Sequence, residues 1–166
     1  MANKIYGAEE SSAIFTETGG NVTFTPKNIA TNSGRVSNQH DRGVGSKARG
    51  YRWYAQTKFA TAAAIGMCVE VWIVRGYGST GAVRDGNISQ TDANVSSVDK
   101  RRNCLWIGNI ACDVAADATQ TFYASGEFYT PARFLQVYFV NVSGVTLTNT
   151  AGDHIFTLEP MADEIQ

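Results

Sequence analysis

In several segments of this chain every second residue is hydrophobic. No stretch between these segments shows a helical pattern long enough for a stable helix. The clearest runs are residues 67–75 and 134–142, where both alternating sets are largely apolar. Because successive side chains of a strand point to opposite faces, the period predicts strands, and two apolar faces predict strands at the centre of a sheet. Glu70 interrupts the first run, so its carboxylate is expected to need a partner.

Shorter β-rich runs are bounded by Gly, Asn, Asp, Ser or Pro, which are typical of turns. With the two central runs they give eight or nine strands: residues 51–61, 105–114, 120–129 and 154–159, and more weakly 13–16, 22–25 and 35–41. Residues 61–66 are too short for a stable helix, and residues 90–102 lack an amphipathic stripe. At most one short helix is expected, between Thr91 and Arg101.

These strands predict an all-β fold. A parallel sheet needs long crossovers, usually helical, between its strands, and the sequence offers none. The expected architecture is an antiparallel two-sheet sandwich of about eight strands. One long excursion, residues 76–103, favours a jelly roll over an immunoglobulin-like sandwich, whose strands are joined more evenly.

The chain has 166 residues, of which 43% are hydrophobic and 17% charged, and this fits one globular domain. Its first part is rich in small and polar residues and has few core candidates. We therefore predict an extended N-terminal arm over residues 1–34 and a β-sandwich over residues 35–166. Within the arm, residues 2–28 are predicted to become ordered only in an assembly, by pairing with a neighbour's sheet edge.

Charge and cysteine usage limit the partners and the compartment. The 14 Lys and Arg against 15 Asp and Glu leave a net charge near zero, which argues against nucleic acid or an anionic membrane as a partner and favours self-association. No signal-peptide core or membrane-length apolar run is present. Cys68, Cys104 and Cys112 lie in apolar runs without nearby zinc ligands, so they are predicted to be buried free thiols. Synthesis in a cytoplasm is expected.

No motif predicts an enzyme, and we assign no catalytic, cofactor-binding or metal-binding residue. His40 and His154 cannot supply the closely spaced histidines of a cupin site, and nucleophile-elbow, phosphate-loop and dinucleotide motifs are absent from the sequence. Residues 85–92 imitate a calcium loop but lack its glycine and its bidentate Glu. Whether strand-borne acids converge in a cleft stays open, with salt bridges or solvent exposure as the default: Glu70, Asp113, Glu127 and Glu159.

Basic residues gather in one segment and in a short run at residues 100–102. The segment contains Arg35, Arg42, Lys47, Arg49 and Arg52. Aromatic residues are not interleaved with this group before Tyr51, so it makes a weak footprint for nucleic acid. A solvated face is the first interpretation, and contact with an acidic partner surface is the second.

The C-terminal two thirds carry a succession of short phrases: RWYAQTKF at 52–59, VEVW at 69–72, DGN at 85–87, SVDKRRN at 97–103, SGE at 125–127, DHIFTLEP at 153–160 and DEIQ at 163–166. In these phrases, residues 50–166 resemble small virion proteins of tailed bacteriophages, and in particular the jelly-roll decoration (cement) proteins that bind the outside of a capsid. The resemblance implies a homotrimer seated on the major capsid protein, a location in the virion and no enzyme activity. It supplies no residue-level site.

The expected function is therefore that of a structural virion protein that stabilises the outside of a phage head. Its partner contacts are predicted in the arm and in the basic segment: Ile5, Tyr6, Phe15, Arg42, Lys47 and Arg49. Two alternatives stay open. A carbohydrate- or receptor-binding jelly-roll module of a phage tail would show a flat, exposed aromatic pair in a groove, and an enzyme would place Glu127 or His154 in a deep pocket.

Overall fold

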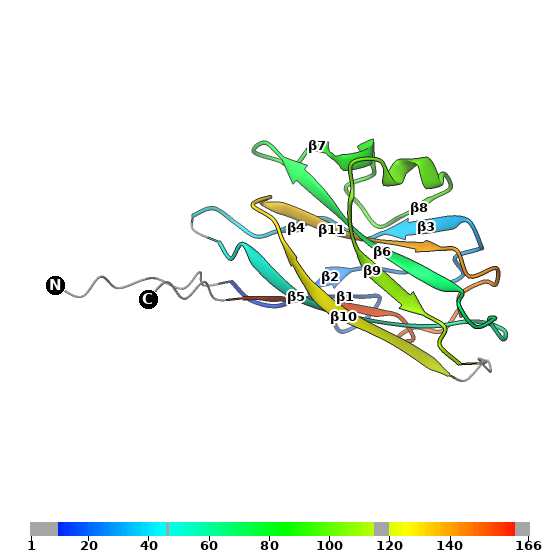
Figure 1. The fold of residues 1–166 in the computed structure, drawn as a ribbon. Helices are drawn as coiled ribbons and strands as arrows, with labels where there is room; N and C mark the ends of the chain where they lie inside the picture. Colours follow the sequence, from blue (N-terminus) through cyan, green and yellow to red (C-terminus); the bar gives the residue numbers. More distant parts are fainter. Residues whose placement is uncertain (1–9, 46, 115–119, 162–166) are drawn as a thin grey trace.

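The computed structural model describes residues 10–45, 47–114 and 120–161, and these form two β-sheets packed face to face (Figure 1). The first sheet has five strands in the order β10–β5–β12–β1–β2. They are β1 (Ala13–Thr16), β2 (Val22–Thr23), β5 (Gly50–Lys58), β10 (Thr121–Tyr129) and β12 (Ile155–Pro160). Neighbours in this sheet run antiparallel, except that β1 and β2 are parallel.

The second sheet has seven strands, in the order β7–β6–β11–β3–β8, with β4 also paired to β11 and β9 also paired to β6. They are β3 (Ser33–Val36), β4 (His40–Asp41), β6 (Cys68–Tyr77), β7 (Val83–Arg84), β8 (Ala93–Val95), β9 (Leu105–Ala111) and β11 (Phe134–Asn141). β6 and β11 pair with each other and have further strands on both sides. This confirms the prediction, made from their two apolar faces, that these strands lie at the centre of a sheet.

Four strand pairs are nested along the chain: β1 with β12, β3 with β11, β5 with β10, and β6 with β9. The chain is thus one long hairpin, wrapped so that successive pairs fall alternately in the two sheets. This is the strand order of a jelly roll, and the predicted two-sheet sandwich is confirmed. The described residues form twelve strands and not about eight, because the short strands β2, β4, β7 and β8 add to the nested pairs.

The core lies between the sheets and is rich in aromatic rings. All of β11 is buried, and Phe156 of β12 has its ring centroid 6.1 Å from that of Trp53 and 6.3 Å from that of Phe139. Gly108 of β9 and Gly126 of β10 flank the indole of Trp53, and a Cβ at either position would come within 2.9 Å of it. The absence of these two side chains lets the edges of the two sheets approach each other across Trp53.

The segment between β6 and β9 folds over the outer face of the seven-stranded sheet (Figure 1). It contains two 3₁₀ turns, η1 (Asp85–Asn87) and η2 (Val98–Arg101). η2 ends within the range predicted for one short helix, whereas η1 was not predicted. A second cluster of buried side chains lies beneath the segment: Val36, Val74, Ile88, Val95, Tyr138 and Val140.

The described part of the predicted arm, from Glu10 to Gly34, belongs to the sandwich. β1 lies between β12 and β2, and Phe15, Phe24 and Ile29 are buried in the core. The structure therefore corrects the arm prediction for these residues. They carry few apolar side chains, but most of these are buried, and β1 pairs with a strand of its own chain. Residues 1–9 lie outside the described residues.

Candidate functional site

His154, which the enzyme alternative would place in a deep pocket, is a buried residue just before β12. Its Nδ1 lies 2.8 Å from the Thr57 hydroxyl oxygen, and its Nε2 lies 3.2 Å from the Thr148 carbonyl oxygen. Because a carbonyl can only accept, Nε2 carries the proton and Nδ1 accepts from Thr57. Burial lowers the pKa of His154, so the ring stays neutral at pH 7. The imidazole ties β5 to the turn before β12.

The four strand-borne acids do not converge in one cleft. Glu70 lies on the seven-stranded sheet, and Asp113 is exposed beyond the end of β9. Glu127 and Glu159 lie on the five-stranded sheet, where each is opposite Arg52 in the pairing register. The Arg52 Nε lies 3.3 Å from a Glu127 carboxylate oxygen, in a pair that is largely exposed. Salt bridges and solvent exposure, the default from the sequence, describe these acids.

The loop of residues 85–92 is held by ion pairs. Asp85 accepts from Arg75 Nε at 2.7 Å, and the two oxygens of Asp92 accept from Nε and Nη2 of Arg35, both at 2.7 Å. The carboxylates that a cation would need are therefore already bonded to guanidinium groups. Across the described ranges, no group of three or more His, Cys, Asp or Glu side chains is placed to hold a metal ion.

The basic segment does not present one continuous face. Arg35 and Arg52 are ion-paired on different sheets, and Arg42 is buried. Lys47 is partly exposed and Arg49 is exposed, both in the connection from β4 to β5. Contact of these two residues with an acidic partner stays a prediction.

Arg42 lies in a buried polar cluster at the end of the sandwich where β5 begins. Its Nε and Nη2 donate to the Glu10 carboxylate at 3.0 and 3.3 Å, and the Tyr51 hydroxyl donates to the same group at 2.6 Å. The guanidinium carbon lies 4.8 Å from the centre of the Tyr51 ring, and other N–H groups donate to the carbonyls of Ala48 and Ala132. This cluster fixes the point at which the described chain enters β1.

Two of the predicted partner contacts, Phe15 and Arg42, are thus interior residues. The Phe15 ring packs against Phe156 at 5.6 Å and His40 at 6.1 Å between ring centroids. This placement corrects the prediction for both residues, because a side chain enclosed by its own chain has no surface to offer a partner. Ile5 and Tyr6 lie outside the described residues.

The outer face of the five-stranded sheet carries an exposed aromatic pair. We define the tyrosine surface as the outward side chains of Tyr54, Gln56, Tyr123, Ser125, Ile155 and Thr157. Tyr54 and Tyr123 are 39% and 59% exposed, with ring centroids 5.9 Å apart and planes tilted by 31°. In the register, Gln56 lies between Tyr123 and Ile155, and Tyr54 lies between Ser125 and Thr157. Polar and aromatic groups therefore alternate across the strands.

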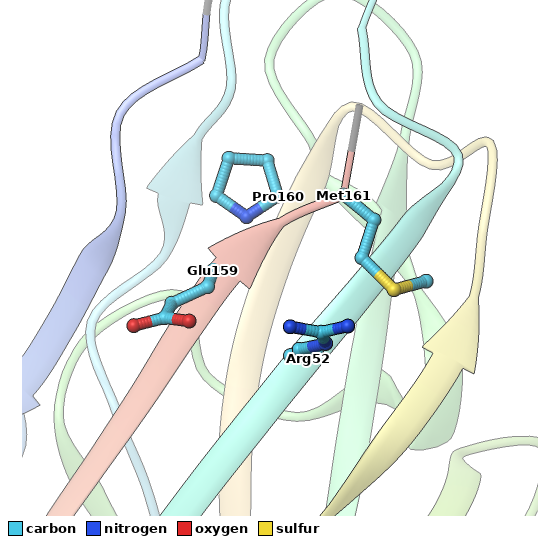
Figure 2. A pocket seen from close by; sticks show the side chains of 4 residues that line it. All are labelled: Arg52, Glu159, Pro160 and Met161. Carbon is cyan, nitrogen blue, oxygen red and sulfur yellow. The ribbon is translucent and has the colours of Figure 1, made fainter. Parts of the chain in front are cut away.

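A recess of about 370 Å³ opens beside this surface, at the end of β12 (Figure 2). Arg52, Glu159, Pro160 and Met161 line it, and Figure 2 shows the guanidinium and the carboxylate on neighbouring strands, with the Met161 side chain above Arg52. Arg52 is the next outward residue to Tyr54 on β5. The recess and the aromatic pair are thus parts of one face.

A second exposed aromatic group lies on the outer face of the seven-stranded sheet. We define the tryptophan surface as Trp72 of β6, Trp106 of β9 and the polar residues beside them, Glu70, Arg101 and Asn109. The two indoles are neighbours in the register, and Trp106 is 53% exposed. The Trp72 Nε1 donates to Glu70 at 2.9 Å, and the Trp106 Nε1 donates to Asn109 at 3.1 Å. Arg101 binds Glu70 at 2.5 Å, which is the partner that the position of Glu70 predicted.

Neither aromatic surface was recognised as a unit in the sequence. The alternation in residues 51–61 places Arg52, Tyr54 and Gln56 on one face, but it does not say that Tyr123 lies on the strand beside them. In comparisons with known proteins, no family model matches the chain and no curated protein sequence matches it. Neither described 3₁₀ turn is long and apolar enough to span a membrane.

Proposed function

We propose that this chain is a structural virion protein that decorates the outside of a phage head as a homo-oligomer, with a trimer as the expected form. The jelly-roll order and the resemblance of residues 50–166 to phage decoration proteins support this role. The observation that carries it is the tryptophan surface, because a component of a shell needs a contact with its neighbours.

Trp106 is suited to a contact between copies of the chain. It lies on β9, which among the described strands pairs with β6 alone and is therefore an edge strand of its sheet. Both indole N–H groups are already bonded within the chain, so the exposed part of the Trp106 ring is left for apolar contact. Tryptophan and arginine are enriched in the central residues of protein interfaces, and the Arg101 guanidinium lies 5.8 Å from the centre of the Trp72 ring.

In this proposal the basic connection before β5 contacts the capsid. Within the basic segment, Lys47 and Arg49 are not buried, and neither forms an ion pair with another described residue. Two cations on a loop beside a rigid sheet suit an acidic region of the major capsid protein, and their contribution would weaken with rising salt.

Light scattering of the purified protein tests the oligomer. We expect a mass of a multiple of 17.9 kDa, and a lower mass for Trp106→Ala, because the truncation removes the centre of the contact. Tyr77→Ala is the matched control, since Tyr77 is also an exposed aromatic residue and lies outside the tryptophan surface. A wild-type protein that stays monomeric at high concentration contradicts the proposal.

Co-sedimentation with phage heads that lack this protein tests the shell contact. The wild type is expected to bind, and Lys47→Glu with Arg49→Glu is expected to abolish binding while the oligomer mass stays unchanged. Electron microscopy of the source particle then locates the density. Density on the tail and not on the head would refute the decoration role.

A further inference from the structure

We propose that the tyrosine surface binds a neutral glycan chain, with sugar rings stacked on Tyr54 and Tyr123 and a terminal or branching sugar in the adjoining recess. This inference concerns a different face from the proposed oligomer contact and does not depend on it. A head protein with this property would attach its particle to glycan-coated surfaces.

The aromatic pair supplies the stacking platform. Tyr54 and Tyr123 come from adjacent strands, and their positions are fixed by the register of β5 and β10. Their ring centroids are 5.9 Å apart, and both rings are exposed although the chain has a core rich in buried aromatic residues. The apolar C–H face of a sugar ring can cover such a ring, and a rigid two-strand support limits the entropy lost on binding.

The neighbouring side chains supply hydrogen bonds of both kinds. Gln56 lies between Tyr123 and Ile155. Its amide donates to the Gly152 carbonyl at 3.2 Å and accepts from the Tyr54 hydroxyl at 3.4 Å, which leaves one N–H and one lone pair for a ligand. Ser125 and Thr157 add a hydroxyl on each side of Tyr54. Sugar hydroxyls both donate and accept, so they match a surface where amide and hydroxyl groups alternate with rings.

Charge on this face favours a neutral ligand. Arg52 is paired with Glu127, and Lys58 is paired with Asp153 at 3.2 Å. Glu159 adds a negative charge beside Arg52. The described residues of this face therefore form no cluster of positive charge for an anionic polysaccharide or a nucleic acid.

The recess lies at one end of the tyrosine surface and can hold a single sugar. Arg52 and Glu159 present planar, bidentate groups there, and Pro160 and Met161 provide an apolar wall (Figure 2). Its volume of about 370 Å³ is at the lower end of the range for small-molecule sites, which suits one or a few sugar units.

A second copy of the chain fits this face less well. The core of an interface between copies is depleted of lysine and glutamate, whereas this face presents Lys58, Glu127 and Glu159 around the two tyrosines. The polar side chains would lose water without a defined partner, which is costly. A glycan offers a hydroxyl to each of them.

Isothermal titration with maltohexaose, cellohexaose and mannohexaose as neutral probes, and with polygalacturonate as the anionic probe, tests the proposal. At least one neutral probe is expected to bind, and Tyr123→Ala and Tyr54→Ala are each expected to weaken its binding about tenfold. Gln56→Ala is expected to weaken it less. Tyr77→Ala is the matched control and should leave glycan binding unchanged, because Tyr77 is an exposed aromatic residue on the other sheet and lies outside both aromatic surfaces.

Each variant is first shown to unfold at the wild-type urea midpoint, so that a lost fold is not mistaken for a lost site. Failure of all three neutral probes to bind overturns the proposal, as does binding of the anionic probe alone. If Tyr123→Ala lowers the oligomer mass, the face is an interface between copies, and the proposal is equally overturned. A monomeric wild type that still binds a neutral glycan would leave this inference standing while the oligomer proposal fails.

Discussion

The Arg42 guanidinium lies in the interior, bonded to the Glu10 carboxylate and stacked on Tyr51. Glu10→Gln keeps the size of the side chain but leaves a buried cation without its counter-charge. We expect the free energy of unfolding to fall by about 3–5 kcal/mol, the usual cost of breaking a buried ion pair from one side. Urea unfolding measures the change.

The control for this prediction is Glu127→Gln, which breaks the exposed pair with Arg52. Its expected cost is below about 1 kcal/mol, because water already solvates both groups. Equal effects of the two substitutions would mean that the Glu10 contact contributes no more than a surface pair.

His154 makes stability depend on pH. Burial lowers the pKa of His154 in the folded state, whereas an unfolded histidine titrates at about 6.5. Above about pH 6.5 both states are neutral, and the contribution of His154 is complete. Below it only the unfolded state takes up the proton, so the free energy of unfolding falls by up to about 1.4 kcal/mol per pH unit for this one residue.

Urea unfolding at pH 7.5 and 5.5 tests that dependence. His154→Gln can still donate to the Thr148 carbonyl and accept from Thr57, but it cannot titrate. We expect the variant to lose less stability than the wild type over this interval. His40, whose pKa burial also lowers, keeps part of the dependence in both proteins. A variant with the same pH slope as the wild type would show that His154 does not cause it.

At the scale of the strand, long alternating runs indicated their place in a sheet, whereas short runs indicated only that they are strands. β6 and β11 contain enough residues for two apolar faces to be seen, so their central positions followed from the sequence. The strand predicted at residues 13–16 is confirmed as β1, but its four residues, of which Ala13 and Phe15 are buried, do not indicate whether it belongs to the sandwich or to an arm. Its place follows from β12, which lies at the other end of the chain.

The aromatic surfaces show the same limit. Tyr54 and Tyr123 meet only because β5 pairs with β10 in a register that places Gln56 opposite Tyr123. Glu70 was different, because a carboxylate within an apolar strand needs a partner whatever the topology, and Arg101 provides it. The need of a side chain for a partner could therefore be predicted from its own strand. Which side chains meet on a surface could not, because that depends on which strands pair and in which register.

β1 and β2 support a prediction about truncation. Deleting residues 2–28 removes both strands and the buried side chains of Phe15 and Phe24, and it exposes one edge of β12. We expect no cooperative unfolding transition, since one such ring removed from a core costs about 3–5 kcal/mol. Deleting residues 2–9 keeps every described strand and is the control. A truncated protein that unfolds cooperatively near the wild-type urea midpoint would show that β1 and β2 are dispensable.

At the scale of the molecule, the nested pairs bring the two ends of the described chain together. Ala13 pairs with Leu158, so the chain enters and leaves the sandwich on adjacent strands. Linking residue 166 directly to residue 1 should therefore leave the fold intact if the chain is reopened between Gly78 and Ser79, two exposed residues after β6. Because loop-closure entropy changes slowly with loop length, we expect this permutant to lose less than about 2 kcal/mol of stability.

A second permutant decides whether the nested hairpin is the unit that folds. Reopening the linked chain between Val137 and Tyr138 cuts β11, which is buried throughout and pairs with β3, β4 and β6. This permutant should give no cooperative transition in urea or by circular dichroism, since the ladder at the centre of one sheet is broken. If both permutants fold equally well, the fold does not depend on an intact β11 at the centre of the seven-stranded sheet. If neither permutant folds, the link itself strains the protein, and the pairing of β1 with β12 is not enough to allow the two termini to be joined directly.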